Sequence, residues 1–361
     1  MKYFKNFFFL LTPYERKQAF LLLLMILIMS LLETIGVASI LPFMAVLTNP
    51  SVVETNFILN TIFQYSSIIG VENNQQFLFA LGSIVFFLLV ISLSFKALTI
   101  YFQTQFVQML EYSIGKRLIE GYLHQPYSWF LSRNSADLGK TILSEVRQVV
   151  VAGIGQFIEI LAKSMIVISI ITLLILTDPK LALTVGLLFG LAYGMIFKLT
   201  QKYLTRIGKE REKSNSLRFL TVIEAFGAVK ELKIGGLEET YIKRFSDPAE
   251  NFARNVASSL IISQLPRFLL EIVAFGGILL LLLYLLANTG SLNASLPIIS
   301  LYVFAGYRLM PALQQIYSAF SILTFNLPSF EKLYNDFKNL KKDKSIKIPG
   351  TLGLDKKIVL K

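Results

Sequence analysis

Apolar residues gather in six long stretches along the chain, separated by segments of contrasting charge. The stretches lie near residues 19–47, 77–105, 149–176, 181–200, 264–287 and 295–322. A helix of about 20 residues crosses a hydrocarbon core about 30 Å thick, and each stretch reaches that length. The pattern therefore predicts an all-α membrane protein with six membrane-spanning helices.

The second stretch continues as a helical pattern beyond the length that a bilayer needs. No proline or turn cluster interrupts it from Phe77 until Pro126. At about 1.5 Å per residue, this segment would reach roughly 70 Å, of which less than half fits in lipid. We therefore expect the helices to extend into the cytoplasm as a stalk.

Basic residues fall almost entirely on one side of the predicted spans. The connection 48–76 contains Glu54 and Glu72 but no lysine or arginine, whereas the segments after the second and fourth stretches are rich in both and the C-terminal tail is rich in lysine. Lysine and arginine are retained on the cytoplasmic side of membranes. The asymmetry, within a net charge of +12, predicts a multi-pass inner-membrane protein with both termini in the cytoplasm.

Several functional classes are disfavoured by composition. Cysteine is absent and His124 is the single histidine, so the sequence offers no disulfide, thiolate metal site or histidine pair. A membrane-embedded transferase or hydrolase would need clustered carboxylates or a histidine–metal set, and the sequence shows neither. Basic residues are not interleaved with aromatic residues on one face, so we expect no nucleic-acid partner.

Two short segments beside the first span are amphipathic. Residues 1–12 are basic and aromatic, and residues 51–69 carry Val53, Phe57, Ile62 and Phe63 at spacings that favour one helix face. Such segments lie in a membrane interface rather than crossing it. We expect an inner interfacial segment and an outer amphipathic helix; a structured loop is the alternative for residues 51–69.

Two cytoplasmic turning points carry aromatic and apolar residues where the predicted stalk reverses direction. The first turning point contains Tyr127, Trp129 and Phe130. The second contains Phe226 and Val229, followed by the basic residue Lys230. Apolar side chains exposed at such a position indicate a docking surface. The alternative is that they pack within the stalk.

This order of elements resembles the transmembrane domain of an ABC exporter (type IV fold). Residues 127–139 (YSWFLSRNSADLG) and 227–233 (GAVKELK) resemble its two coupling helices. Residues 32–43 (LETIGVASILPF), 265–271 (LPRFLLE) and 307–311 (YRLMP) are most similar to bacterial flippases of lipid-linked oligosaccharides. The resemblance implies a homodimer, with an ATPase domain docked on both turning points.

The resemblance assigns residues 1–340 to the transmembrane domain and 341–361 to a linker and the start of a nucleotide-binding domain. No G-x-x-x-x-G-K-[ST] motif occurs, so we expect no cofactor to be bound by this chain. ATP and Mg²⁺ are expected on a nucleotide-binding domain, either in a longer form of this chain or in a separate polypeptide.

Ionisable residues inside the predicted spans are candidates for a substrate site, because charges in lipid are costly. Glu159 with Lys163, and Arg267 with Glu271, have the i,i+4 spacing of local ion pairs. Arg308 has no acid within four residues, so it would meet Glu33, water or an anion.

We predict a substrate cavity containing Lys96, Arg267, Arg308 and Glu33, in which the cations hold an anionic head group. The leading hypothesis is an ATP-driven translocase of a lipid or lipid-linked oligosaccharide. The alternatives are an exporter of peptides or other hydrophobic compounds, and a non-transporting membrane scaffold without its ATPase.

Overall fold

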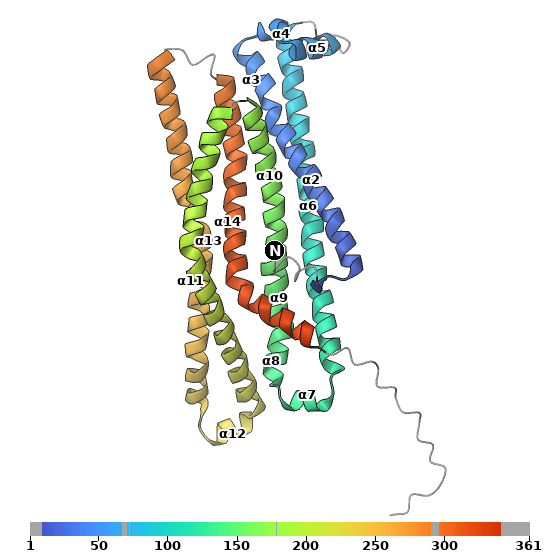
Figure 1. Ribbon diagram of the computed structural model, residues 1–361, viewed down its shortest axis with the longest axis vertical. Helices are drawn as coiled ribbons and strands as arrows, with labels where there is room; N and C mark the ends of the chain where they lie inside the picture. The colour runs from blue at the N-terminus through green and yellow to red at the C-terminus, as the bar shows by residue number, and fades with distance from the viewer. Residues whose placement is uncertain (1–8, 67–70, 72, 178, 290–295, 341–361) are drawn as a thin grey trace, which may run out of the picture.

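The computed structural model describes residues 9–66, 71, 73–177, 179–289 and 296–340, and these residues form long helices without a strand (Figure 1). This confirms the predicted all-α fold. Most of the predicted interfacial segment 1–12, and the whole of the predicted linker 341–361, lie outside the described residues.

The helices assemble into long columns connected by short elements. The bounds are α2 (Pro13–Ala38), α3 (Ile40–Thr48), α4 (Val52–Thr55), α5 (Phe57–Ser66), α6 (Asn74–Leu123), α7 (Tyr127–Leu131), α8 (Ser135–Lys140), the π-helical η2 (Thr141–Glu145), α9 (Val146–Val149), the π-helical η3 (Val150–Gly155), α10 (Gln156–Thr177), α11 (Pro179–Gly227), α12 (Val229–Ile234), α13 (Glu238–Thr289) and α14 (Leu296–Asn339).

Among the described residues, three helical segments are long and apolar enough to cross a membrane, judged by length and composition. They are Pro13–Thr48, Asn74–Leu123 and Ser135–Thr177. They contain the first three predicted spans, while membrane crossing by α11, α13 and α14 stays a prediction. Helix α6 has 50 residues, a length of about 75 Å, so the expected extension beyond a bilayer is present.

Local sequence signals explain where several helices begin. Thr12 and Glu15 form a reciprocal capping box at the start of α2, with Pro13 in the first turn. Asn73 caps α6 by accepting a hydrogen bond from the Gln76 backbone N–H, and Asn134 caps α8 in the same manner. These caps satisfy backbone donors that have no partner inside the helix.

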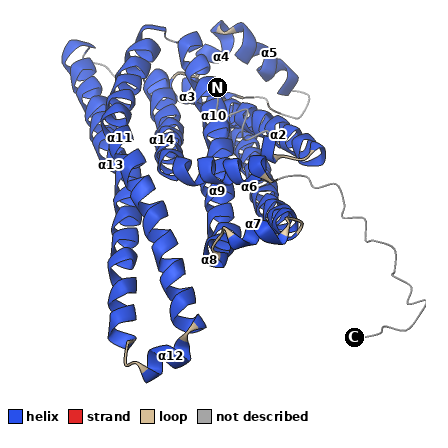
Figure 2. Cartoon of the chain, turned by 60° about the horizontal axis from the view of Figure 1, so that its bottom comes forward, coloured by secondary structure: helices blue, strands red, loops and turns tan. Residues whose placement is uncertain are grey.

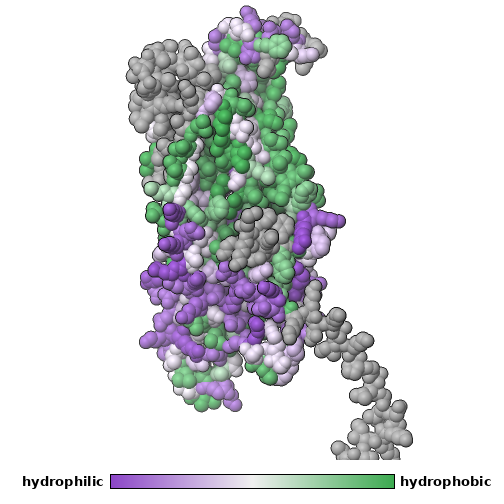
Figure 3. Space-filling model, in the orientation of Figure 1, coloured by the Kyte–Doolittle hydropathy of each residue, from purple (hydrophilic) through white to green (hydrophobic). Residues whose placement is uncertain are grey.

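The lower part of the molecule is a polar stalk with two separate ends. Helices α11 and α13 form a long hairpin closed by α12, and its lowest end stands apart from α7 and α8 (Figure 2). Figure 3 shows a hydrophobic upper surface above a hydrophilic band, with hydrophobic patches again at the lowest ends. This distribution follows the charge pattern of the sequence.

The outer amphipathic segment forms two short helices, α4 and α5, and the predicted apolar face is only partly right. Val53 and Leu59 are buried in a cluster with Phe77, and Phe63 packs against that cluster. Phe57, expected on the packed face, is 86% exposed. The break between α4 and α5 at Asn56 interrupts the helical phase on which that expectation depended.

A buried ion pair in the stalk joins η2, which belongs to the column from α8 to α10, to α11. Arg211 Nη2 lies 3.3 Å from Glu145 Oε2, and both side chains are 1% exposed. Asn215 donates to the second oxygen of Glu145 at 2.8 Å. Because a buried charge without a partner is strongly destabilising, this network constrains how α11 and η2 pack.

Helices α11 and α14 approach each other closely at Gly208. A Cβ atom added there would overlap the backbone carbonyl oxygen of Phe325, whose backbone cannot move aside as a flexible side chain can. Leu204 and Ile207 pack with Phe325 around this contact. The absence of a side chain at residue 208 therefore sets the spacing of the two helices.

We expect Gly208→Ala to destabilise the protein by about 1–3 kcal/mol, the usual range for overpacking. Gly194→Ala is the matched control, because it lies on the same helix and an added Cβ would meet nothing within 4 Å. Thermal unfolding in detergent would show a lower midpoint for Gly208→Ala alone. Equal midpoints would contradict the close approach of α11 and α14.

Candidate functional site

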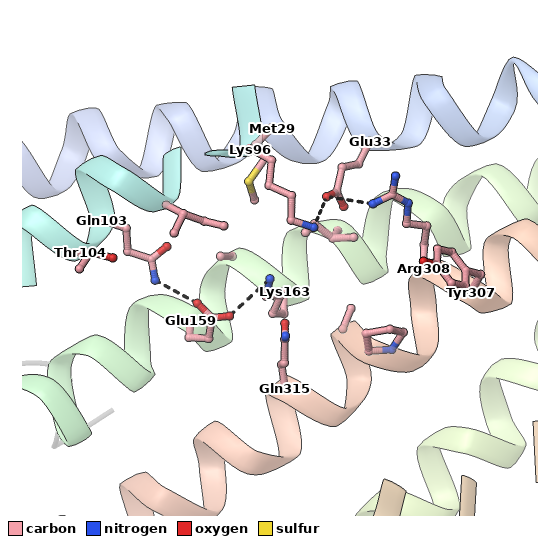
Figure 4. A pocket seen from close by; sticks show the side chains of 15 residues that line it. Met29, Glu33, Lys96, Gln103, Thr104, Glu159, Lys163, Tyr307, Arg308 and Gln315 are labelled. Carbon is pink, nitrogen blue, oxygen red and sulfur yellow. Dashed lines mark hydrogen bonds and ion pairs between the residues drawn. The ribbon is translucent and has the colours of Figure 1, made fainter. Parts of the chain in front are cut away.

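A cavity of about 490 Å³ lies between four helices of the bundle, and charged and polar side chains line much of it (Figure 4). The helices are α2, α6, α10 and α14. The lining residues are Met29, Glu33, Lys96, Ile100, Gln103, Thr104, Glu159, Ala162, Lys163, Ile166, Tyr307, Arg308, Pro311, Ala312 and Gln315.

Glu33 is the central acid of this cavity. Lys96 Nζ of α6 lies 2.6 Å from Glu33 Oε1, and Arg308 Nη1 of α14 lies 3.6 Å from the same oxygen. Glu33 is 2% exposed, because it shares the buried face of α2 with Met29, Ser30 and Val37. One buried carboxylate thus pairs with cations from two other helices.

A second charged level lies along the same cavity. Gln103 Nε2 donates to Glu159 Oε2 at 3.0 Å, and Lys163 Nζ lies 3.4 Å from Glu159 Oε1. Gln103 follows Lys96 by seven residues on α6, which places the two on one face about 10 Å apart. The cavity therefore has two polar levels joined by α6.

The lining carries more positive than negative charge. Three cations (Lys96, Lys163 and Arg308) face two carboxylates (Glu33 and Glu159), which leaves one net positive charge. Charged groups at this position are costly unless paired, and the pairs above satisfy them incompletely because one carboxylate serves two cations. The arrangement is suited to accepting an additional anion.

Proline gives the α14 wall a polar backbone atom. Pro311 lies inside α14 and lines the cavity. Because proline has no N–H, the carbonyl of Tyr307 lacks its ordinary intrahelical donor. The carbonyl oxygen of Tyr307, one residue before Arg308, is therefore available as a hydrogen-bond acceptor beside the cavity.

The structure brings three of the four predicted cavity residues together and places the fourth elsewhere. Glu33, Lys96 and Arg308 converge, whereas Arg267 lies on α13 and does not line this cavity. Its Nε lies 2.7 Å from Glu271 Oε1, and its side chain is 54% exposed. Sequence reasoning missed Gln103, although its spacing of seven from Lys96 could have placed it on the same face.

The two turning points form short helices with exposed apolar residues. We name α7 the α7 tip and α12 with the preceding Phe226 the α12 tip. Tyr127 is 77% and Phe226 75% exposed, and Val229 and Lys230 are also exposed. The tips therefore present apolar side chains to the surroundings, as expected from the sequence.

Trp129 and Phe130 depart from that expectation, because both are only partly exposed. The Trp129 ring lies 5.4 Å from the Tyr122 ring, and the Arg133 guanidinium lies 4.4 Å from its centre. The stalk-packing alternative thus describes Trp129 better. The contact between Trp129 and Tyr122 depends on where the end of α6 lies beside α7. No helical periodicity in the sequence indicates that position.

Within the described residues, no group of three or more histidine, cysteine, aspartate or glutamate side chains is placed to hold a metal ion. The cavity combines fixed charges, amide groups and a net positive balance. Such an arrangement can bind and orient an anionic group.

Comparison with known proteins agrees with this architecture. Residues 19–311 match the family described as ABC transporter transmembrane region. The ATP-dependent lipid A-core flippases of Cupriavidus metallidurans and Ralstonia nicotianae are 28% and 25% identical to the chain over 134 residues, 37% of this chain and 22% of theirs. The chain thus matches about a fifth of the length of these relatives.

The fold is similar to that of a bacterial Atm1-family ABC exporter solved with ATP bound. The TM-score is 0.61 at 11% identity, over 90% of this chain and 54% of that chain. The likeness supports the fold, and the family match covers most of the chain. The protein belongs to the ABC transporter transmembrane region family.

Proposed function

We propose that this chain is the membrane-spanning part of an ATP-driven transporter that moves a lipid with an anionic head group, such as a lipid-linked oligosaccharide. The observation that carries the proposal is the sharing of Glu33 by Lys96 and Arg308 inside the bundle. Arginine matches phosphate oxygens with paired donors. The relatives named as flippases support a lipid cargo.

In this proposal, Glu33 acts as the counter-ion of Lys96 and Arg308 until a substrate arrives. An arriving phosphate or phosphate-like group would take over part of the pairing with Arg308 and Lys96, while the lipid tail stays in the bilayer. An uncharged hydrophobic compound would gain nothing specific from these cations.

The proposal also includes partners beyond this chain. A second copy would complete the translocation pathway, and a nucleotide-binding domain carrying ATP and Mg²⁺ would dock on the two tips, with both termini in the cytoplasm. The exposed Tyr127, Phe226, Val229 and Lys230 support this docking, with Trp129 and Phe130 shaping the α7 tip from its packed side.

Arg308→Ala should weaken binding of a phosphate-bearing lipid roughly 10- to 150-fold, because a hydrogen bond to a charged group contributes about 1.5–3 kcal/mol. Arg308→Lys should recover part of it, since an ammonium cannot form the forked contact. Binding of the lipid, and of a neutral lipid with the same tail, would be measured on purified protein. Transport would be measured with the ATPase domain present.

Arg267→Ala is the control for Arg308→Ala, because Arg267 forms an exposed pair outside the cavity. We expect it to change phosphate-lipid binding little. Equal losses for Arg267→Ala and Arg308→Ala would show that the cavity is not the head-group site. Equal losses for phosphate-bearing and neutral lipids would exclude a role for charge.

Glu33→Gln should lower the thermal midpoint in neutral detergent, because Lys96 and Arg308 lose their shared carboxylate. A phosphate-bearing lipid should then raise the midpoint by more than it does in the unaltered protein, because Lys96 and Arg308 no longer pair with a carboxylate. Glu271→Gln, which breaks only a partly exposed pair, should show neither effect. Suppose that an anionic lipid does not stabilise the Glu33→Gln protein and that adding Arg308→Gln restores its thermal midpoint. Glu33 and Arg308 would then form only a structural pair.

Tyr127→Asp and Phe226→Asp should each uncouple ATP hydrolysis from transport in the complete transporter, because a charge at an apolar contact opposes docking. Tyr112→Asp is the control, since Tyr112 is 61% exposed on α6 between the predicted span and the α7 tip. Hydrolysis and transport would be measured together in proteoliposomes. Normal coupling in both tip variants would mean that the tips do not carry the ATPase contact.

A further inference from the structure

The lower end of α14 changes direction and crosses the stalk. The lower part of α14 turns aside and passes over α9 toward the lower part of α6 (Figure 1), and α14 contains Pro328 near its C-terminal end. Helix α14 contacts α9, η2 and η3. Because proline removes an intrahelical hydrogen bond and bends a helix, Pro328 accounts for the turn. We name residues 329–339 the crossing segment.

The crossing segment is packed against the helices that it crosses. Phe330 and Leu333 are fully buried in one cluster with Leu118 of α6 and Val149 of α9. Just past the segment, Leu340 fills the space beside Gly121, where an added Cβ would come within 2.8 Å of Leu340 Cδ1. The segment is thus an integral part of the stalk core.

One end of the crossing segment is tied to α11 by charge. Lys332 Nζ lies 2.9 Å from Glu212 Oε1, and Lys140 Nζ lies 3.1 Å from the same oxygen. Burial alone would raise the pKa of Glu212, but the hydrogen bond from Lys332 and the charges of Lys140 and Lys332 outweigh it, so the pKa of Glu212 lies below its ordinary value. The carboxylate therefore stays ionised and keeps both partners.

The other end reaches the α7 tip through Asp336. Asp336 Oδ2 accepts a hydrogen bond from Tyr122 Oη at 3.2 Å, and its Oδ1 lies 3.6 Å from Arg133 Nη1. Arg133 lies two residues beyond the end of α7 and covers the Trp129 ring, which in turn packs on Tyr122. Asp336 thus contacts two of the residues that pack against Trp129.

Apart from the packing of Trp129 on the stalk cluster, the α7 tip is held by few buried contacts. It has five residues, and none of them is buried. A short element with few buried contacts is easily displaced. An ion pair to a residue on a firmly packed helix therefore has a large share in fixing its orientation.

We propose that Asp336 is a positioning residue that orients the α7 tip, through Arg133 and Tyr122, against the crossing segment. The proposal rests on the proposed function of the α7 tip as an ATPase contact. Through Lys332 and Glu212, the same segment links the α7 tip to α11, so that movement of α11 is transmitted to the tip.

Trp129 provides a direct test, because it is the single tryptophan of the chain. In Asp336→Asn, the Trp129 emission of the full chain in detergent should shift to longer wavelength and acrylamide should quench it more strongly. Asp336→Glu, which keeps the charge, should recover part of the change. Glu120→Gln is the control: it removes an exposed carboxylate of α6 that pairs with Lys116, and should leave the fluorescence unchanged.

Tyr122→Phe gives a second variant should Asp336→Asn fail to fold, because it removes the hydroxyl donor and keeps the ring beside Trp129. It should change the emission in the same direction by a smaller amount. Unchanged Trp129 fluorescence in a folded Asp336→Asn protein, or in Tyr122→Phe when the former does not fold, would overturn the proposal.

Coupling in the complete transporter separates this proposal from the proposed function. Lower coupling of hydrolysis to transport together with altered Trp129 fluorescence supports both. Altered fluorescence with normal coupling supports the positioning role of Asp336 and contradicts α7 as the ATPase contact. Lower coupling with unchanged fluorescence overturns the positioning role.

Discussion

The need to neutralise charge within a largely apolar bundle governs the arrangement of α2, α6 and α14. Glu33 is buried on α2, and a buried carboxylate is tolerated only with cationic or hydrogen-bonding partners. Lys96 and Arg308 supply them from two helices distant in sequence. Because one carboxylate serves both, these helices must converge at this level, and the cavity forms where they do so.

The stalk depends on the same principle at greater distance from the apolar region. Glu145 with Arg211, and Glu212 with Lys140 and Lys332, join three columns through buried or half-buried charges. Hydrogen bonds and ion pairs are directional, whereas apolar contacts tolerate sliding. The stalk is therefore held in a defined register, which suits an element proposed to transmit movement between the cavity and the two tips.

Glycine and proline decide where these columns can meet. Gly208 permits contact between the α11 and α14 backbones, and Pro328 directs α14 across the stalk. The crossing segment then brings Asp336 to the α7 tip. Steric constraints of two residue types thus place the charged side chains that link the elements.

The sequence by itself determined the all-α class, the long helices, the two turning points and the local pairs. These properties arise from composition and from neighbours within one or two helical turns, as in Arg267 with Glu271 and Glu159 with Lys163. The apolar pattern also predicted six spans, which follow from hydropathy summed along each helix.

Only the tertiary structure decided which ionisable residues converge. Glu33 and Lys96 are 63 residues apart, and their pairing depends on how whole helices pack, for which a single sequence contains no periodic signal. The same reason explains why Arg267 falls outside the cavity, why Trp129 packs within the stalk, and why Asp336 reaches the α7 tip. A helix periodicity specifies which side chains share a face, but the helix that this face meets is set by packing of the whole bundle.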